Sequence, residues 1–199
     1  MIESVSLRIY DFVAKYVDID EEMSDVYRYG IEITVSSFLN IVLVMILSLL
    51  LGDPLSGAVF LSCLISVRSY CGGYHADSYF KCNFMVLLLY LVTHLAATAL
   101  FFFNISNFYL FSGLSLLAFV PFIAFSPVRN IHKELSPQKA RKCRKMSFVL
   151  YILICLIGMM LTAYGSVYGS IVIVTLVDIS VMILIEIFFQ RRNKNETSS

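Results

Sequence analysis

The stretch FMVLLLYLVTHLAATALFFF, residues 84–103, decides the fold class of this chain. It contains no Lys, Arg, Asp or Glu. A helix needs about 20 predominantly apolar residues to cross the hydrocarbon core of a bilayer, and a segment in lipid must satisfy its own backbone hydrogen bonds. The stretch therefore predicts a membrane-spanning helix.

Other apolar runs predict five more spans. They are residues 31–51, 55–67, 108–125, 148–163 and 171–189. The composition agrees, because 59% of the residues are hydrophobic, 15% are charged and the mean hydropathy is +0.81. A typical soluble domain is about 45 to 50% apolar and about 25% charged. We therefore expect an all-α integral membrane protein with six transmembrane helices.

The second run is short, because residues 55–67 are followed by Arg68 within one turn. At about 1.5 Å per residue, such a helix is shorter than a hydrocarbon core of roughly 30 Å. We expect it to tilt, to thin the bilayer locally or to follow a partly re-entrant path.

The positive charges are sorted by segment. The 15 Lys and Arg nearly cancel the 14 Asp and Glu, so a net charge of +1 gives no reason to expect a nucleic-acid partner. Three cations precede the first run, two separate the second from the third, seven separate the fourth from the fifth, and three follow the sixth. Because positively charged loops stay in the cytoplasm, both termini and the two long loops are expected inside. The chain then reads as one domain over residues 1–199, with a cytoplasmic segment 1–30, a six-span bundle 31–189 and a cytoplasmic tail 190–199.

Two further helices are expected outside the spans. Residues 2–17 carry apolar side chains at helical spacing with polar ones opposite, which predicts an amphipathic helix on the inner membrane face or packed under the bundle. Ser136 and Pro137 suit an N-cap and a first helical position, which predicts a short cytoplasmic helix before the fifth span.

The five cysteines are expected to be free. Cys63 and Cys155 fall inside spans, whereas Cys71, Cys82 and Cys143 fall in segments assigned to the reducing cytoplasm. A thiol there is available for chemistry.

Residues 68–82 combine an Arg, a Gly-Gly pair, a His and a Cys at the membrane surface. A cysteine nucleophile needs a nearby base, and His75 and Cys82 provide such a pair. In one continuous helix, positions seven apart are separated by about 10.5 Å along the axis, so the pair requires a turn of the chain. Gly72 and Gly73 provide flexibility just before His75.

A zinc site is the chemical alternative, with Cys71, His75 and Cys82 as ligands. Neither C-x3-H nor H-x6-C is a standard spacing for zinc ligands. We therefore expect no metal and no other cofactor.

Neighbouring residues have alternative roles. Arg68 either contacts substrate or orients the loop, or it is a charge that snorkels from a helix end. Gly72 and Gly73 either donate N–H groups to an oxyanion or terminate a helix. Asp77 either orients the His75 ring or is an exposed carboxylate.

These residues resemble a known family, that of accessory gene regulator B (AgrB), the membrane endopeptidases that process quorum-sensing propeptides in Gram-positive bacteria. The matching pattern is Arg68, Gly72-Gly73, His75-Ala76 and Cys82. The likeness extends to the chain length, the six spans, the amphipathic N-terminal segment and a basic loop that opens with Ser126-Pro127. It implies that Cys82 is the nucleophile and His75 its base.

The resemblance also implies a reaction and its partners. The Cys82 thiolate would attack a signal propeptide, release its acidic C-terminal tail and hold the rest as an acyl-thioester, which then closes to a thiolactone or lactone ring. It further implies a homodimer in the bacterial cell membrane, with the active site cytoplasmic. The alternative is a small membrane carrier or assembly protein with a non-catalytic loop.

Three ionisable residues fall inside spans, where such groups are costly and often functional. They are His94, Asp178 and Glu186. Glu186 lies close to the inner interface, and Asp178 is the deepest. We expect Asp178 to pair with His94 or to support a helix contact, whereas a proton- or solute-translocating role lacks an obvious pathway.

Overall fold

The computed structural model of this chain describes residues 2–16, 21–71, 79–103, 105, 108–128 and 137–196. Seven helices form in these ranges, and no strand does. Their bounds are α1 Ile2–Ala14, α2 Glu21–Leu50, α3 Pro54–Cys71, α4 Tyr79–Phe102, α5 Phe108–Phe125, α6 Pro137–Ala163 and α7 Val167–Glu196. Helices α2 to α7 are long and apolar enough to cross a membrane, which confirms the all-helical fold with six spans.

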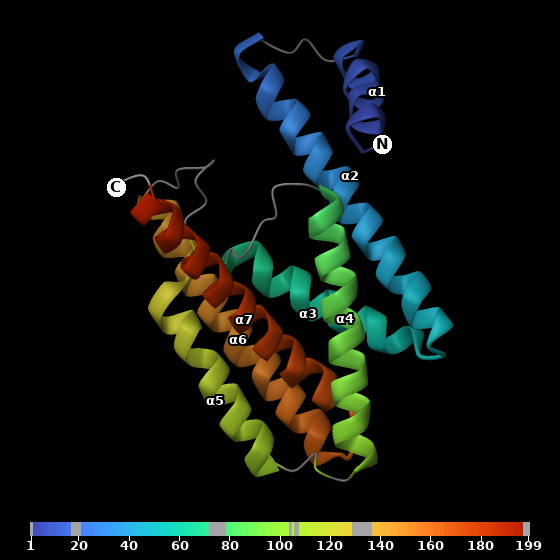
Figure 1. Cartoon of the computed structure of the whole chain (residues 1–199), viewed down its shortest axis with the longest axis vertical. Helices are drawn as coiled ribbons and strands as arrows, with labels where there is room; N and C mark the ends of the chain where they lie inside the picture. Colours follow the sequence, from blue (N-terminus) through green and yellow to red (C-terminus); the bar gives the residue numbers. More distant parts are fainter. Residues whose placement is uncertain are drawn as a thin grey trace.

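Helix α2 begins ten residues earlier than its apolar run. The extra turns are polar and project beyond the bundle, where Arg28 pairs with Glu32 one turn later at 3.3 Å. Helix α1 packs alongside these turns (Figure 1), and the Tyr10 hydroxyl lies 2.7 Å from the Ser24 hydroxyl. The expected N-terminal helix is confirmed, and it packs on the projecting part of α2 rather than under the bundle.

Helix α3 crosses the bundle obliquely (Figure 1), which corresponds to tilt, one of the three expected alternatives. It begins at Pro54, and the Asp53 side chain accepts a hydrogen bond from the Ser56 amide at 3.2 Å, so Asp53 is the N-cap. Asp53 also accepts a hydrogen bond from the Tyr168 hydroxyl of α7 at 3.3 Å. At the other end, the Cys71 carbonyl accepts one from the Val128 amide, just after α5, at 2.9 Å. Helix α3 therefore runs from one end of the bundle to the other on a tilted path.

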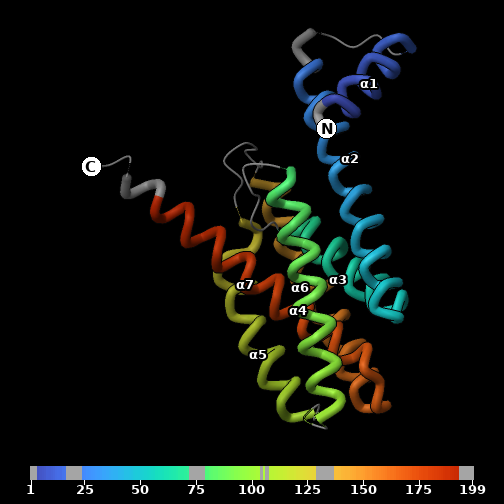
Figure 2. Tube along the Cα trace, turned by 45° about the vertical axis from the view of Figure 1, so that its right-hand side comes forward, coloured from blue at the N-terminus to red at the C-terminus, as the bar shows by residue number. Residues whose placement is uncertain are grey.

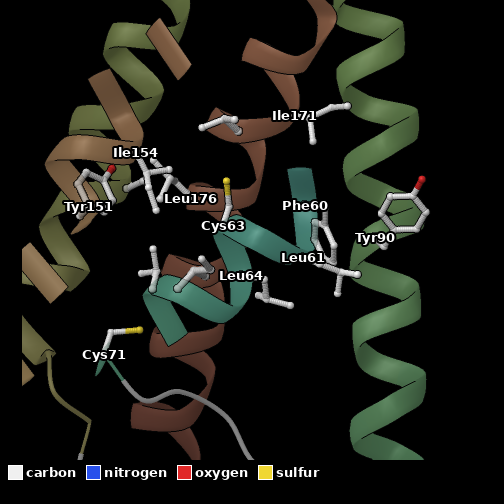
Figure 3. Packing of buried hydrophobic residues seen from close by; sticks show 14 of the residues in the cluster. Phe60, Leu61, Cys63, Leu64, Cys71, Tyr90, Tyr151, Ile154, Ile171 and Leu176 are labelled. Carbon is white, nitrogen blue, oxygen red and sulfur yellow. The ribbon is translucent and has the colours of Figure 1, made fainter. Parts of the chain in front are cut away.

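Helix α7 forms the centre of the molecule, because it packs against α3, α4, α5 and α6 (Figure 2). Of the residues in the most apolar stretch of α7, 56% are buried inside the protein, whereas the share in α2 is 17%. Figure 3 shows how α3 fills the space beside it: Cys63 points toward Leu176 and Ile154, and Phe60 packs on Tyr90 with ring centroids 5.3 Å apart. The tilted α3 and the buried α7 together make the core.

Helix α6 differs from the prediction in one respect. A helix does begin at Pro137, but it continues without a break to Ala163, so the basic turns are the first turns of the fifth spanning helix and not a separate short helix. The intervening residues contain no Pro or Gly until Gly158, so nothing in the sequence interrupts the backbone hydrogen bonds.

Candidate active site

The candidate site lies at the end of the bundle where α3 ends and α4 begins. Helix α3 ends at Cys71 and α4 begins at Tyr79, and the oblique α3 and the upright α4 cross at a steep angle in Figure 1. The hydrogen bond from the Val128 amide to the Cys71 carbonyl joins the residue that follows α5 by a short turn to the end of α3. The ends of α3 and α5 therefore lie together at this end of the bundle.

Cys82 is the fourth residue of α4, a free thiol with a partly buried side chain. The apolar run predicts a helix from residue 84, whereas α4 starts at Tyr79, so Cys82 lies inside the first turns rather than before them. At 100° per residue, Cys82 lies within about 20° of the direction of Thr93, a member of the buried stripe of α4. The Cys82 thiol therefore lies beside the buried stripe of α4, close to the N-terminus of the helix.

The other expected site residues are placed only in part. Gly72, Gly73, His75 and Asp77 lie outside the described residues. Arg68 is described and lies, partly buried, in the last turn of α3, at the same end of the bundle as Cys82.

The cysteines differ in burial. Cys63 and Cys71 are buried, with 7% and 0% of their surface exposed, whereas Cys82, Cys143 and Cys155 are partly exposed. Figure 3 shows the Cys71 side chain at the end of α3, directed toward neighbouring helices. Within the described ranges no cluster of three His, Cys, Asp or Glu is arranged to hold a metal. The zinc alternative includes His75, which those ranges leave out.

Two hydrogen bonds that the sequence analysis missed bracket Cys82. The Tyr79 hydroxyl donates to Glu32 of α2 at 2.7 Å, and the Ser36 hydroxyl of α2 donates to the Asn83 side chain at 2.9 Å. Glu32 and Ser36 are one turn apart on the same face of an apolar span. Two polar residues so placed predict a polar contact with a neighbouring helix, and this pattern could have identified them from the sequence.

The buried acid of α7 has a different partner from the expected one. Asp178 accepts a hydrogen bond from the hydroxyl of Thr93, and no bond to His94 is found. The His94 ring instead packs on Tyr90, with centroids 5.9 Å apart. Glu186 accepts a hydrogen bond from Gln190 one turn later at 2.8 Å. Asp178 thus supports the contact between α4 and α7, which was the second alternative.

Comparison with known proteins agrees with this geometry. The family model "Accessory gene regulator B" matches residues 6–190. Two proteins of Clostridium perfringens are similar to the chain. AgrB-like protein 2 of strain 13 is 28% identical and an AgrB-like protein of strain SM101 is 26% identical, and both names are provisional assignments. Each alignment covers 73% of this chain and 69% of the relative.

No solved structure gave a significant match to the chain. The family match extends from α1 into the last turns of α7 and includes all the candidate site residues. With six spanning helices and a match over most of its length, the chain belongs to the accessory gene regulator B family, which is involved in accessory gene regulator quorum sensing.

Proposed function

We propose that this protein is a membrane cysteine endopeptidase that removes the C-terminal tail of a quorum-sensing propeptide and cyclises the retained peptide. The observation that carries the proposal is the free, partly buried thiol of Cys82 in the first turns of α4. A thiolate is stabilised at a helix N-terminus. Residues 72–78, which include His75, end where α4 begins.

The reaction follows from a cysteine and a histidine acting together. The Cys82 thiolate attacks the carbonyl carbon of the scissile bond, the C–N bond breaks, and the imidazolium of His75 gives its proton to the departing amine. The retained peptide is then a thioester on Cys82. A thiol or hydroxyl within that peptide loses its proton to His75 and attacks the thioester, which closes the ring and restores the Cys82 thiolate.

The proposed orientation places this chemistry in the cytoplasm of a bacterial cell, with both termini on that side. Arg68 at the end of α3, Lys81 at the start of α4 and the basic turns at the start of α6 all belong to one end of the bundle. The turns around Gly52 and Gly165 at the other end have no Lys or Arg. Positively charged segments are retained inside, where a newly made propeptide is found.

Intact-mass measurement tests the proposal. The purified protein is incubated with a candidate propeptide, and the mass of the protein is followed together with release of the tail peptide. We expect an acyl adduct in the wild type, none in Cys82→Ala, and a much slower one in His75→Ala. Cys143→Ala is the matched control, because Cys143 is another partly buried free thiol, and its adduct should form at the wild-type rate.

Tail release by Cys82→Ala at the wild-type rate would refute the catalytic assignment. Absence of any adduct or tail release in the wild type, with propeptide still bound, would favour the carrier or assembly alternative. Unchanged turnover in His75→Ala would mean that another group activates Cys82.

A further inference from the structure

The contact between α2 and α4 has a regular pattern near Cys82. Tyr79 pairs with Glu32 and Asn83 pairs with Ser36, and in each pair the two residues are 47 positions apart. A constant separation means that the helices run parallel with a fixed register at this point. The first turn of α4 is therefore attached to α2 at both of its ends.

The Ser36–Asn83 pair is buried, and the Tyr79–Glu32 pair is partly buried. Ser36 and Asn83 are each 6% exposed, and the Glu32 side chain is 14% exposed and also pairs with Arg28 at 3.3 Å. Hydrogen bonds in such surroundings are stronger than in water, and a broken pair leaves a buried polar group unsatisfied. These four side chains, Glu32, Ser36, Tyr79 and Asn83, are named here the α2–α4 seam.

Cys82 lies between the two anchors of the seam, three residues after Tyr79 and directly before Asn83. Terminal helical turns fray unless they are held, and a frayed turn would change both the direction and the exposure of this thiol. We propose that the α2–α4 seam is a positioning device that holds the Cys82 thiol in the orientation required for attack on the peptide carbonyl. This inference rests on the proposed function.

The α2–α4 seam gives a role to the carboxylate of Glu32 and the phenol of Tyr79. Tyr79 reaches Glu32 across the helix gap, and Arg28 offsets the charge of Glu32, so the anchor adds no uncompensated negative charge beside a thiolate. Misplacement of a reacting group by about 1 Å costs up to about 100-fold in rate. Loss of one anchor should therefore be visible in the acyl-transfer step.

Two sets of variants test the seam. Tyr79→Phe removes one hydroxyl, and Tyr109→Phe is the matched control, because Tyr109 is 86% exposed at the start of α5. Asn83→Ser alone breaks the second anchor, whereas Asn83→Ser combined with Ser36→Asn exchanges the two partners and can restore the bond. Two readouts are taken: the rate of adduct formation with propeptide, and the alkylation rate of each cysteine by iodoacetamide, mapped by mass spectrometry.

We expect Tyr79→Phe and Asn83→Ser to slow adduct formation about tenfold at unchanged propeptide KM, within the range that misplacement produces. Cys82 should be alkylated faster in both, while the buried Cys63 and Cys71 remain protected. The exchanged pair should recover most of the rate. Tyr109→Phe should match the wild type.

Three outcomes would overturn the inference. Wild-type adduct rates in both Tyr79→Phe and Asn83→Ser would show that the seam does not position Cys82. Faster alkylation of Cys63 and Cys71 in those variants would indicate general unfolding instead, as would failure of the exchanged pair to recover. A wild-type protein that forms no adduct would reject the proposed function itself, which is a different result from an active wild type with unaffected variants.

Discussion

The crossing of α6 and α7 depends on glycines that allow close approach, and Gly169→Ala should weaken it. A methyl group on Gly169 would lie 2.8 Å from the carbonyl oxygen of Gly158 and closer still to the backbone nitrogen and hydroxyl of Thr162. Two of these are backbone atoms of α6, and the Gly158 oxygen already accepts a bond from the Thr162 hydroxyl at 2.9 Å. The clash cannot be relieved by a rotamer change.

The size of the effect follows from the displacement required. An ordinary Cβ contact begins at 3.4 Å, so α7 must move away from α6 by at least 0.6 Å, the difference between 3.4 and 2.8 Å. Overpacking of this kind costs about 1–3 kcal/mol. At about 2–4 °C per kcal/mol for a chain of this size, Tm should fall by roughly 2–12 °C.

Thermal unfolding in detergent, followed with a thiol-reactive fluorophore, measures this change, because the buried Cys63 and Cys71 become reactive only on unfolding. Gly113→Ala is the matched control. A methyl group there meets nothing within 4 Å, and Ala is favoured over Gly in a helix by about 1 kcal/mol, so its Tm should stay level or rise. Equal Tm values for the two variants would refute the close-packing argument.

The remaining predictions concern polar groups and orientation. Thr93→Val removes the hydroxyl bonded to Asp178 and leaves a buried acid unsatisfied, so the same unfolding assay should show a loss of about 1–3 kcal/mol, and an unchanged Tm would contradict that contact. Asn40→Leu should keep or raise Tm, because its side-chain oxygen is buried with no hydrogen-bond partner among the described residues, and a clear fall would reveal one. A membrane-impermeant maleimide should label Cys143 in inside-out vesicles only. In a Cys143→Ala background, the exposed turn variant Tyr164→Cys should react in intact cells, and labelling of both positions from one side would contradict the proposed orientation.

Apolar runs predicted the number of spans but not the lengths of the helices. The run of the first span begins at residue 31 and that of the fifth at residue 148, whereas α2 begins at Glu21 and α6 at Pro137. Hydrophobicity reports which turns contact lipid, and the helical hydrogen bonds continue through polar sequence into the surrounding water. A helix end therefore has to be sought in Pro and capping residues, as with Pro54 after Asp53.

Partners between helices were the least predictable feature. Thr93 and His94 are neighbours in sequence, yet they point about 100° apart on α4, so only one of them can face Asp178. Thr93 is fully buried and is the one that does. To predict which of the two faces Asp178, one must know how α4 is oriented about its own axis. That orientation is determined by contacts with α2, α3 and α7, and no local sequence pattern encodes it.

The sorted cations and the proposed nucleophile Cys82, which are separate signals in sequence, lie at one end of the bundle. The bond from Val128 to Cys71 joins the end of α5 to the end of α3, and α4 starts with Tyr79 at the same end of the bundle. An acidic peptide tail is attracted by positive charge at this end of the protein. The end of the protein that carries Cys82 would therefore also attract the proposed substrate. A rise in salt concentration should weaken propeptide capture more than it slows ring closure. Capture depends on attraction between well-separated charges, which dissolved ions screen, whereas ring closure occurs within the bound peptide.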